Sequence, residues 1–511
     1  MLQRLFAQPT HGALLRLTLI ALVPRVVAAF FSGGYFAHDD HFLVAEPARS
    51  WADGSDYNYW LPWHQEGTPR PSGHSFFYVG LHWVFFKLML LVGLKDPDAC
   101  MVVVRLIHAV WSLVVVRMGY RIALRLSDPA TAWRAGLFLA LLGFMPFLSV
   151  RNLVEVACIP FLMLGAWQLV RGSGGPGLRE ALLAGVWLGM AMNVRFQTIF
   201  FAAGPGLALL LQRNWKGTLA YGAGLLLPLV VVQGGIDLFL WGRPFAELTE
   251  YVGYNLVNTT TYGVQPWYNY LLLLAGLLIP PFGLLVMWGF VRRPAPLVVW
   301  LPVVLFVAIH SWFPNKQERF ILPIVPLYLT LGLVAWEGLR RSSAWWQRHQ
   351  GLWRGILAWT WGVSTLLLVV LCFTTSKQSR LEAMRLVKDR PDVEGWVVED
   401  SPEHEPPMLP KYYCLHWEAT VVDMPDTTFN IDSTMTFWRG HPGRTPNYAF
   451  LIGQEDLQRR IARLEGAMGP LEPVGQAEPG FVDRFVHWLN PVNRNEVITV
   501  MRVRDEVGAA R

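Results

Sequence analysis

The stretch RGILAWTWGVSTLLLVVLCFT, residues 354–374, carries a single charge, Arg354, in an otherwise uncharged and mostly apolar run. About 20 such residues suffice for a helix to cross the hydrocarbon core of a bilayer. From Ser376 onward charged residues become frequent and apolar runs become short. The stretch therefore predicts both a last membrane span and the start of a soluble domain behind it.

Similar apolar runs recur upstream, beginning at residue 13. Hydrophobic residues make up 53% of the 511 and charged residues only 16%, whereas soluble proteins carry about 25% charge. The sequence thus predicts an all-α polytopic membrane protein with about eleven transmembrane helices. The predicted spans are 13–31, 102–124, 132–148, 153–171, 180–194, 197–212, 218–240, 269–291, 297–312, 320–338 and 354–374.

The net charge of +6 sits largely in short loops between these runs. Such loops carry orientation signals, so the charge does not indicate nucleic-acid binding. The apolar segment 74–94 either spans the membrane or lies in its interface, and only the interfacial alternative puts every basic loop on the cytoplasmic side. We therefore expect a cytoplasmic N-terminus and an outside C-terminus.

Two domains follow from this pattern. Residues 1–375 are predicted to form the transmembrane domain, with outer loops at 32–101 and 241–268. Residues 376–511 are predicted to form a small extracytoplasmic α/β domain, a size that can hold its own core. Its expected strands are Gly395–Val398, Tyr448–Ile452 and Val497–Val503, with a helix at Glu455–Glu465. The four cysteines lie far apart in the chain without CxxC spacing, which indicates neither a metal knuckle nor a disulfide framework.

His38-Asp39-Asp40-His41 opens the first outer loop. Its carboxylates could act as a general base on an acceptor hydroxyl. The same four residues could bind a divalent metal. They could equally be a capped helix start with acidic residues in its first turn. The spacing alone leaves these three interpretations open.

Charged residues also occur at the ends of predicted spans, where ionisable groups face the protein interior or water. Arg195 interrupts a long uncharged stretch, and a buried arginine suits a phosphate held at the membrane surface. The alternative, for Arg195 as for Arg105 and Arg151, is a side chain that extends to the interface. Glu155 accompanies Arg151 at the start of a span.

Two further outer segments have an unusual composition, one in aromatic and one in charged residues. The passage from Tyr251 to Tyr270 is rich in aromatic residues, which serve either as membrane anchors or as sugar-stacking surfaces. The passage Asn315–Arg319 places two cations on the outer side. An anionic ligand or an internal pair between Lys316 and Glu318 would explain them.

Four passages together resemble the membrane mannosyltransferases of glycosyltransferase family 22, which have the GT-C fold. They are Asp39-Asp40-His41-Phe42, Arg151-Asn152-Leu153-Val154-Glu155, Asn255 followed by Tyr262-Gly263-Val264-Gln265-Pro266-Trp267-Tyr268, and Lys316-Gln317-Glu318-Arg319-Phe320-Ile321-Leu322-Pro323. The family usually has Glu where Asp40 stands and His where Asn315 stands. Its Trp-Glu-Trp passage is missing here, where the chain has Tyr59-Trp60-Leu61-Pro62-Trp63.

The resemblance implies inverting transfer of a hexose, most simply mannose, from a polyprenyl- or dolichyl-phosphate carrier to a lipid-linked or membrane-associated glycan. It implies catalytic roles for Asp39 and Asp40. Donor-phosphate binding would fall to Arg195, Lys316, Arg319 and Arg105. Acceptor or sugar binding would fall to Arg151, Glu155, Asn255, Tyr262 and Trp267. No metal or other cofactor is expected, because the phosphate is already a good leaving group.

Other functions remain as alternatives. A lipid-linked sugar transporter or flippase would also have many spans, and a metal-dependent GT-C oligosaccharyltransferase would need a divalent ion. A scaffold protein would act through the soluble tail. The unusual acceptor region and the large tail favour a bacterial cytoplasmic membrane over the endoplasmic reticulum.

Overall fold

The computed structural model describes residues 12–261, 263–292, 295–400, 406–425 and 428–504. The chain forms two compact units. The first comprises Met1–Phe31, Trp60–Leu81 and Val102–Phe373, and the second comprises Ser32–Tyr59, His82–Met101 and Thr374–Arg511. The second unit thus joins the C-terminal segment to two pieces of the predicted first outer loop.

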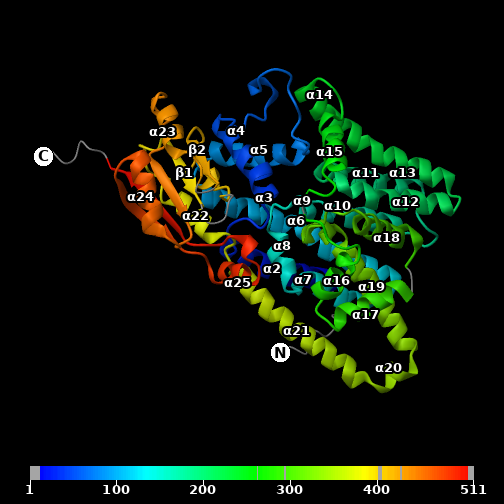
Figure 1. Ribbon diagram of the computed structural model, residues 1–511. Helices are drawn as coiled ribbons and strands as arrows, with labels where there is room; N and C mark the ends of the chain where they lie inside the picture. The colour runs from blue at the N-terminus through cyan, green and yellow to red at the C-terminus, as the bar shows by residue number, and fades with distance from the viewer. Residues whose placement is uncertain (1–11, 262, 293–294, 401–405, 426–427, 505–511) are drawn as a thin grey trace. The chain divides into compact units, whose positions relative to one another are not determined.

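The first unit is a bundle of apolar helices (Figure 1). Each predicted span falls on one helix or on a broken pair. In chain order these are α2 (Ala13–Phe31), α6 (Pro97–Leu126), α7 (Pro129–Leu141) with α8 (Phe144–Ser149), α9 (Val154–Ala157) with α10 (Ile159–Val170), α11 (Leu178–Val194), α12 (Ile199–Leu211), α13 (Trp215–Pro228) continuing to α14 (Gly235–Trp241), α16 (Asn269–Leu277) with α17 (Phe282–Arg292), α18 (Leu297–Trp312), the 3-10 helix η5 (Glu318–Ile324) with α19 (Val325–Ser342), and α21 (Gln350–Cys372).

Among the described residues, five helical stretches are long and apolar enough to cross a membrane. They are Ala13–Phe31, Pro97–Leu126, Trp215–Trp241, Glu318–Ser342 and Gln350–Cys372. The pair α16 and α17 would make a sixth, although it bends by 120°. Pro280 and Pro281 occupy this bend, where their missing amide protons interrupt the helical hydrogen bonds. The protein is an integral membrane protein, and the total of eleven spans stays a prediction.

The segment 74–94 forms one helix, α5 (Phe76–Leu91), of 16 residues. At 1.5 Å per residue it measures about 24 Å, which is less than the hydrocarbon thickness of about 30 Å. The predicted span at α18 also has 16 residues, so this length is compatible with both alternatives for the segment.

Two buried charges tie the helices of the first unit together. The Arg25 guanidinium donates to the carbonyl oxygens of Ala21, Leu139 and Ala140 and to the hydroxyl of Ser112. Glu337, which is fully buried, accepts from Arg340 at 2.8 Å and also pairs with Arg134. In both places hydrogen bonds satisfy a charge that would otherwise be costly in an apolar interior.

The second unit contains a five-stranded sheet with the order β2-β1-β3-β5-β4. Its strands are β1 (Gly395–Glu399), β2 (Thr420–Met424), β3 (Tyr448–Ile452), β4 (Leu471–Ala477) and β5 (Ile498–Val503). β1 pairs in parallel with β2 and β3, whereas β5 pairs antiparallel with β3 and β4. The three predicted strands are present, as is the helix, which is α24 (Leu457–Met468).

The prediction was wrong in omitting β2 and β4, and the reason is their position at the two edges of the sheet. β2 alternates buried and exposed residues and includes Asp423. β4 contains Pro473 and Gly475 around an irregular register. Edge strands tolerate proline and bulges, so they lack the continuous apolar run that marks a central strand.

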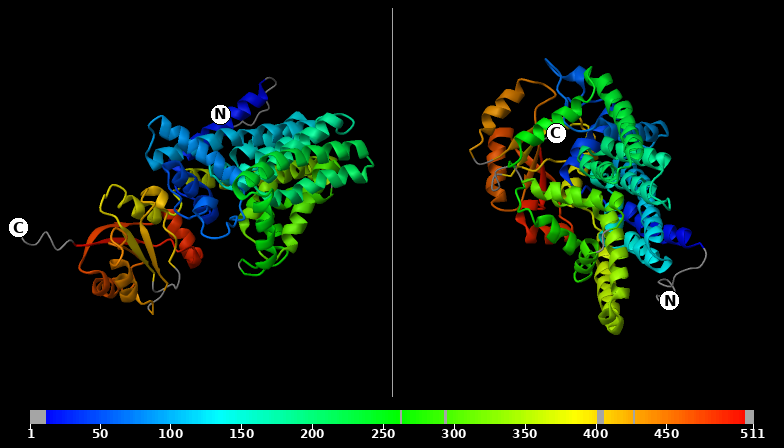
Figure 2. Two further views of the ribbon diagram at one scale, coloured as in Figure 1. Left: turned by 90° about the horizontal axis from the view of Figure 1, so that it is seen from above. Right: turned by 90° about the vertical axis from the view of Figure 1, so that its right-hand side faces the viewer.

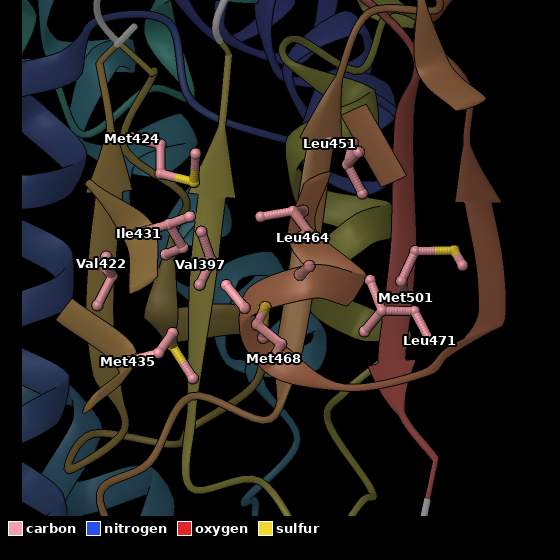
Figure 3. Packing of buried hydrophobic residues seen from close by; sticks show 12 residues of the cluster. Val397, Val422, Met424, Ile431, Met435, Leu451, Leu464, Met468, Leu471 and Met501 are labelled. Atoms are coloured by element: carbon pink, nitrogen blue, oxygen red, sulfur yellow. The ribbon is translucent and has the colours of Figure 1, made fainter. Parts of the chain in front are cut away.

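The core of this domain lies between one face of the sheet and the helices α23 (Ile431–Arg439) and α24. Figure 3 shows Val397 and Leu451 of the sheet packed with Met435 and Leu464 of these helices. The central strands β1 and β3 are buried along their whole length. The helix α22 (Gln378–Arg385) contacts β4 and β5, and the strands with their surrounding helices are visible from two further sides in Figure 2.

Candidate active site

Asp39 and Asp40 lie in the second unit, at the start of a helical segment. The segment runs through α3 (His38–Asp40), a π-helix η1 (His41–Ala45) and α4 (Glu46–Asp53). Asp40 is buried and Asp39 is half-buried. The residue before α3, Ala37, offers no side-chain cap. The helix start predicted as one alternative is present, without the cap, and the half-buried carboxylate of Asp39 is the more accessible of the two.

The π-helix brings His41 and Glu46 together. The backbone N–H of Glu46 donates to the carbonyl of His41, five residues earlier, and their side chains meet with 3.1 Å between His41 Nε2 and Glu46 Oε2. Five-residue spacing in an α-helix would point the two side chains in different directions, whereas the wider π turn aligns them. Both residues are 1% exposed, so this buried pair holds together the helical segment that directly follows Asp40 in the chain.

The second unit surrounds this pair with tyrosines. The His41 ring stacks on Tyr35 and Tyr413, with centroid distances of 4.8 and 5.8 Å. Glu46 also accepts from the backbone N–H of Tyr412 at 3.2 Å, and the Tyr57 hydroxyl donates to the carbonyl of Phe42 at 3.4 Å. Burial, and secondly the Glu46 carboxylate, raises the pKa of the Tyr57 phenol, which keeps it a proton donor. The C-terminal segment therefore holds the loop that carries Asp39.

In the first unit a buried carboxylate collects two of the predicted cations. Glu155 is fully buried. Its Oε1 lies 3.1 Å from Arg195 Nη2 and 3.4 Å from Arg319 Nη1. Both guanidinium groups also lie over the ring of Phe320, at 5.1 and 5.4 Å from its centroid. Amide side chains complete the support, since Gln197 accepts from Arg195 and Gln317 accepts from Arg319. Two positive charges thus share one negative charge in a nearly dry environment.

Lys316 adds a third cation. Its Nζ donates to the carbonyl of Gln265 at 3.0 Å and to that of Phe313, and Glu318 is exposed rather than paired with it. The backbone also joins these two passages of the chain, because Val264 and Asn315 form an antiparallel bridge. The structure therefore brings two of the four family-like passages side by side.

A cavity of about 200 Å³ opens beside Phe320. It lies among α11, α12, α18 and α15 (Ala246–Val257), all labelled in Figure 1. Its wall is mainly apolar, with Phe196, Phe200 and Leu248 among the lining residues, and its few polar groups include Asn255 and His310. A mainly apolar wall with a few polar groups is typical of a ligand-binding pocket.

A buried polar network positions α15 along this cavity. Gln233 Nε2 donates to Asp237 at 2.9 Å and to Glu247 at 2.8 Å. Glu247 also accepts from the backbone N–H of Phe76 at 2.9 Å. Burial, and secondly the neighbouring Asp237, raises the pKa of Glu247. The second outer loop is therefore bonded to the first residue of α5, and the α15 wall of the cavity is held with it.

The remaining predicted site residues are more dispersed. Arg105 Nε donates to the carbonyl of Ala29 at 2.7 Å, near the end of α2. Arg151 is buried, and its guanidinium lies over Phe147 at 4.4 Å. Trp267 is 65% exposed, and Tyr262 lies outside the described residues. None of these geometries tests the roles predicted for them.

Comparison with known proteins gives the family. Residues 16–394 match the model of the Alg9-like mannosyltransferase family, which is most of the chain. The chain belongs to this family. The family predicted from the four passages is confirmed, and the membership covers the transmembrane domain and the segment up to β1.

Individual members of the family are distant from this chain. It is 26% identical over 327 residues to GPI mannosyltransferase 3 of Yarrowia lipolytica, with 62% of each chain covered. It is 29% identical over 158 residues to the alpha-1,2-mannosyltransferase ALG9 of Mus musculus, covering 25% of this chain and 24% of that protein. The chain therefore spans less than two thirds of the length of these relatives.

A solved structure extends the likeness of fold to nearly the whole chain. ArnT from Cupriavidus metallidurans, in a crystal structure bound to undecaprenyl phosphate, superposes with a TM-score of 0.62 at 14% identity. The match covers 96% of this chain and 98% of that one. The predicted GT-C fold, with its C-terminal α/β domain, is confirmed.

Some residues that contact the predicted site residues were not predicted from the sequence. Glu46 and Tyr413 contact His41, the residue after Asp40, and the guanidinium groups of Arg195 and Arg319 lie over the ring of Phe320. Among the described residues, no three His, Cys, Asp or Glu side chains gather as a metal site. Metal independence itself stays a prediction.

Proposed function

We propose that this family member is an inverting glycosyltransferase. It moves a hexose, mannose in the first instance, from a polyprenyl-phosphate carrier to a lipid-linked or membrane-associated glycan at the outer face of the membrane. The observation that carries the proposal is the Glu155–Arg195–Arg319 cluster beside an apolar cavity of about 200 Å³. Family membership supports the same reaction.

The cluster suits the phosphate of such a donor for electrostatic reasons. Arg195 and Arg319 carry two positive charges, and Glu155 supplies one negative charge. A phosphodiester that joins carrier and sugar adds the negative charge that this group of residues lacks. Lys316 is proposed as a further phosphate contact. Guanidinium groups bind phosphate oxygens with paired hydrogen bonds, and burial strengthens each bond. The adjacent cavity would hold the first isoprene units of the carrier.

The chemical step needs one base and one leaving group. Asp39 accepts the proton of the acceptor hydroxyl as its oxygen forms a bond to the anomeric carbon. The bond between that carbon and the phosphate oxygen breaks, and the polyprenyl phosphate leaves with the electron pair. Attack from the face opposite the phosphate inverts the anomeric configuration. Asp40 and the His41–Glu46 pair hold Asp39 in place, and Arg195 with Arg319 stabilises the charge on the departing phosphate.

Acceptor and sugar contacts are proposed for Arg151, Asn255, Trp267 and Tyr262, and an additional phosphate contact for Arg105. We propose no metal for the reaction. The bacterial cytoplasmic membrane stays our predicted location. The N-terminus is predicted on its inner side and the C-terminal domain on its outer side.

The test is transfer of labelled mannose from a synthetic polyprenyl-phosphate mannose in membranes that contain the protein. Wild type is compared with Asp39→Asn, with and without EDTA. Asp96→Asn is the matched control, because Asp96 lies in the same unit and its side chain is 46% exposed in a surface pair with Lys388. Expression of each variant is measured by immunoblot and by elution as a single peak in detergent.

Transfer that survives EDTA, persists in Asp96→Asn and disappears in Asp39→Asn is the expected result. Unchanged transfer in a well-expressed Asp39→Asn variant would refute Asp39 as the base and favour Asp40. Loss of transfer with EDTA, restored by a divalent cation, would refute metal independence. Absence of transfer by the wild type would reject mannose as the donor sugar.

A further inference from the structure

The helix α25 (Phe481–Leu489) of the second unit carries an exposed apolar face. Phe481 is 83% exposed, Phe485 50%, Trp488 74% and Leu489 61%. Positions 481, 485 and 488 follow the spacing i, i+4, i+7, so their side chains share one side of the helix. Single exposed apolar residues are ordinary, but a contiguous group of large ones marks an interaction surface.

The opposite side of α25 is anchored within the unit. Asp483 is 5% exposed and accepts from the backbone N–H groups of Lys377 at 3.1 Å and Gln378 at 2.8 Å. Its own carbonyl accepts from Asn495 at 3.3 Å. Lys377 Nζ adds bonds to the carbonyl of Asn493 and the side chain of Asn495. The orientation of α25 is thus fixed relative to the segment that precedes α22.

That segment leaves the membrane only a few residues earlier. The last span, α21, ends at Cys372, five residues before Lys377. Five residues of extended chain reach at most about 18 Å. The partner of Asp483 is therefore within reach of the outer membrane interface by chain length alone.

The chain segment that follows a second predicted span is bonded to the same stretch of the second unit. α2 ends at Phe31, and Ser32 Oγ then donates to the carbonyl of Thr374 at 2.9 Å. The N–H of Ser376 donates to the carbonyl of Gly33 at 3.2 Å. Gly34 has φ +72°, and a Cβ there would lie 1.9 Å from the carbonyl oxygen of Ser376, so only glycine fits. The segments that follow two predicted spans, α2 and α21, are therefore hydrogen-bonded to each other in the second unit.

We propose that α25 lies in the outer interface of the lipid bilayer and inserts its aromatic face among the lipids. Trp and Phe side chains concentrate at this interface. An amphipathic helix of nine residues, about 14 Å long, fits in its plane with the apolar face buried about 5–10 Å. Arg484 borders the aromatic face, and its charge is paired with Glu478 at 2.9 Å. Apolar contact, rather than attraction to anionic lipid, therefore carries the binding.

The experiment places an environment-sensitive fluorophore at position 488 of the full-length protein, as Trp488→Cys, in phosphatidylcholine nanodiscs. The four native cysteines are all buried, which limits background labelling. The control is Phe437→Cys on α23, where Phe437 is 59% exposed in the same unit. Quenching is measured with doxyl-labelled lipid and with iodide in the water. A probe at position 485 repeats the measurement if Trp488→Cys lowers the thermal unfolding midpoint.

The expected result is at least twofold stronger quenching by doxyl lipid at position 488 than at position 437, with weaker quenching by iodide, unchanged by added salt. Equal iodide quenching at both positions would overturn the proposal, because the face would then be in water. Protection from iodide without doxyl quenching, seen only in discs that hold two copies, would also overturn it and assign the face to a second copy of the chain.

Discussion

Replacement of Glu155 by glutamine tests whether the arginines around it form a phosphate site. Glutamine keeps the shape of the side chain and removes its charge. Arg195 and Arg319, whose side chains are 12% and 8% exposed, would then face each other without a carboxylate. Breaking a buried ion pair by removing one partner costs about 3–5 kcal/mol, because the remaining charge is neither solvated nor paired.

This loss should lower the midpoint of thermal unfolding in detergent by roughly 3–5 °C, because an unfolding entropy of about 2.1 cal/mol/K per residue amounts to about 1.1 kcal/mol/K for 511 residues. A bound polyprenyl phosphate would supply the missing negative charge. At a concentration 100 times its Kd, a ligand stabilises the folded state by about 2.7 kcal/mol. We therefore expect polyprenyl phosphate to raise the midpoint more in Glu155→Gln than in wild type, and to recover about half of the loss.

Glu337→Gln is the matched control. Glu337 is also fully buried, and it pairs with three arginines, Arg134, Arg340 and Arg341. It lies near the opposite end of the helical stretch Glu318–Ser342, about 27 Å from Arg319 along the helix. This variant should lose a similar amount of stability, and polyprenyl phosphate should not restore it beyond the shift seen in wild type.

The assay follows unfolding of the purified protein by intrinsic fluorescence, with and without a short-chain polyprenyl phosphate. Equal lipid-dependent shifts in the two variants would refute a phosphate site at Glu155. An unchanged midpoint in Glu155→Gln would refute the reasoning itself, since the arginines would then need no counter-charge.

Two further predictions concern the second unit. Tyr413→Ala removes the ring stacked on His41 and should lower kcat at least tenfold with little change in KM. Tyr413→Phe keeps the stacked ring and should retain activity. Similar kcat values for the two variants would contradict a positioning role. Burial, and secondly Glu496, raises the pKa of Asp400 to about 7. The folded state therefore holds a proton that the unfolded chain releases above about pH 4, so this group's contribution to stability falls as pH rises from about 4 to 7. Asp400→Asn should raise the free energy of unfolding more at pH 8 than at pH 5, and the difference should be on the order of 2–4 kcal/mol. An equal effect at both pH values in denaturant unfolding would contradict this account.

The spans, the central strands and the family could be predicted because their signals are local. An apolar run such as 354–374 becomes a helix whatever surrounds it, and β1 and β3 read as continuous apolar strands because both faces are covered. The π-helix at His41–Ala45 could not be predicted, because no local spacing distinguishes it from an ordinary helical turn. The edge strands β2 and β4 were missed for the related reason that half of each strand faces solvent.

The sequence by itself determined that this is a membrane protein of the Alg9-like family, and it named the arginines, lysine and carboxylates of the candidate site. Hydropathy, charge position and motif order are properties of the chain itself, so they can be recognised without knowledge of how the helices pack. Only the tertiary structure decided that Arg195 and Arg319 converge on Glu155, while Arg105 and Arg151 contact other groups. Such partners lie tens to hundreds of residues apart, and the packing of many helices at once selects among them.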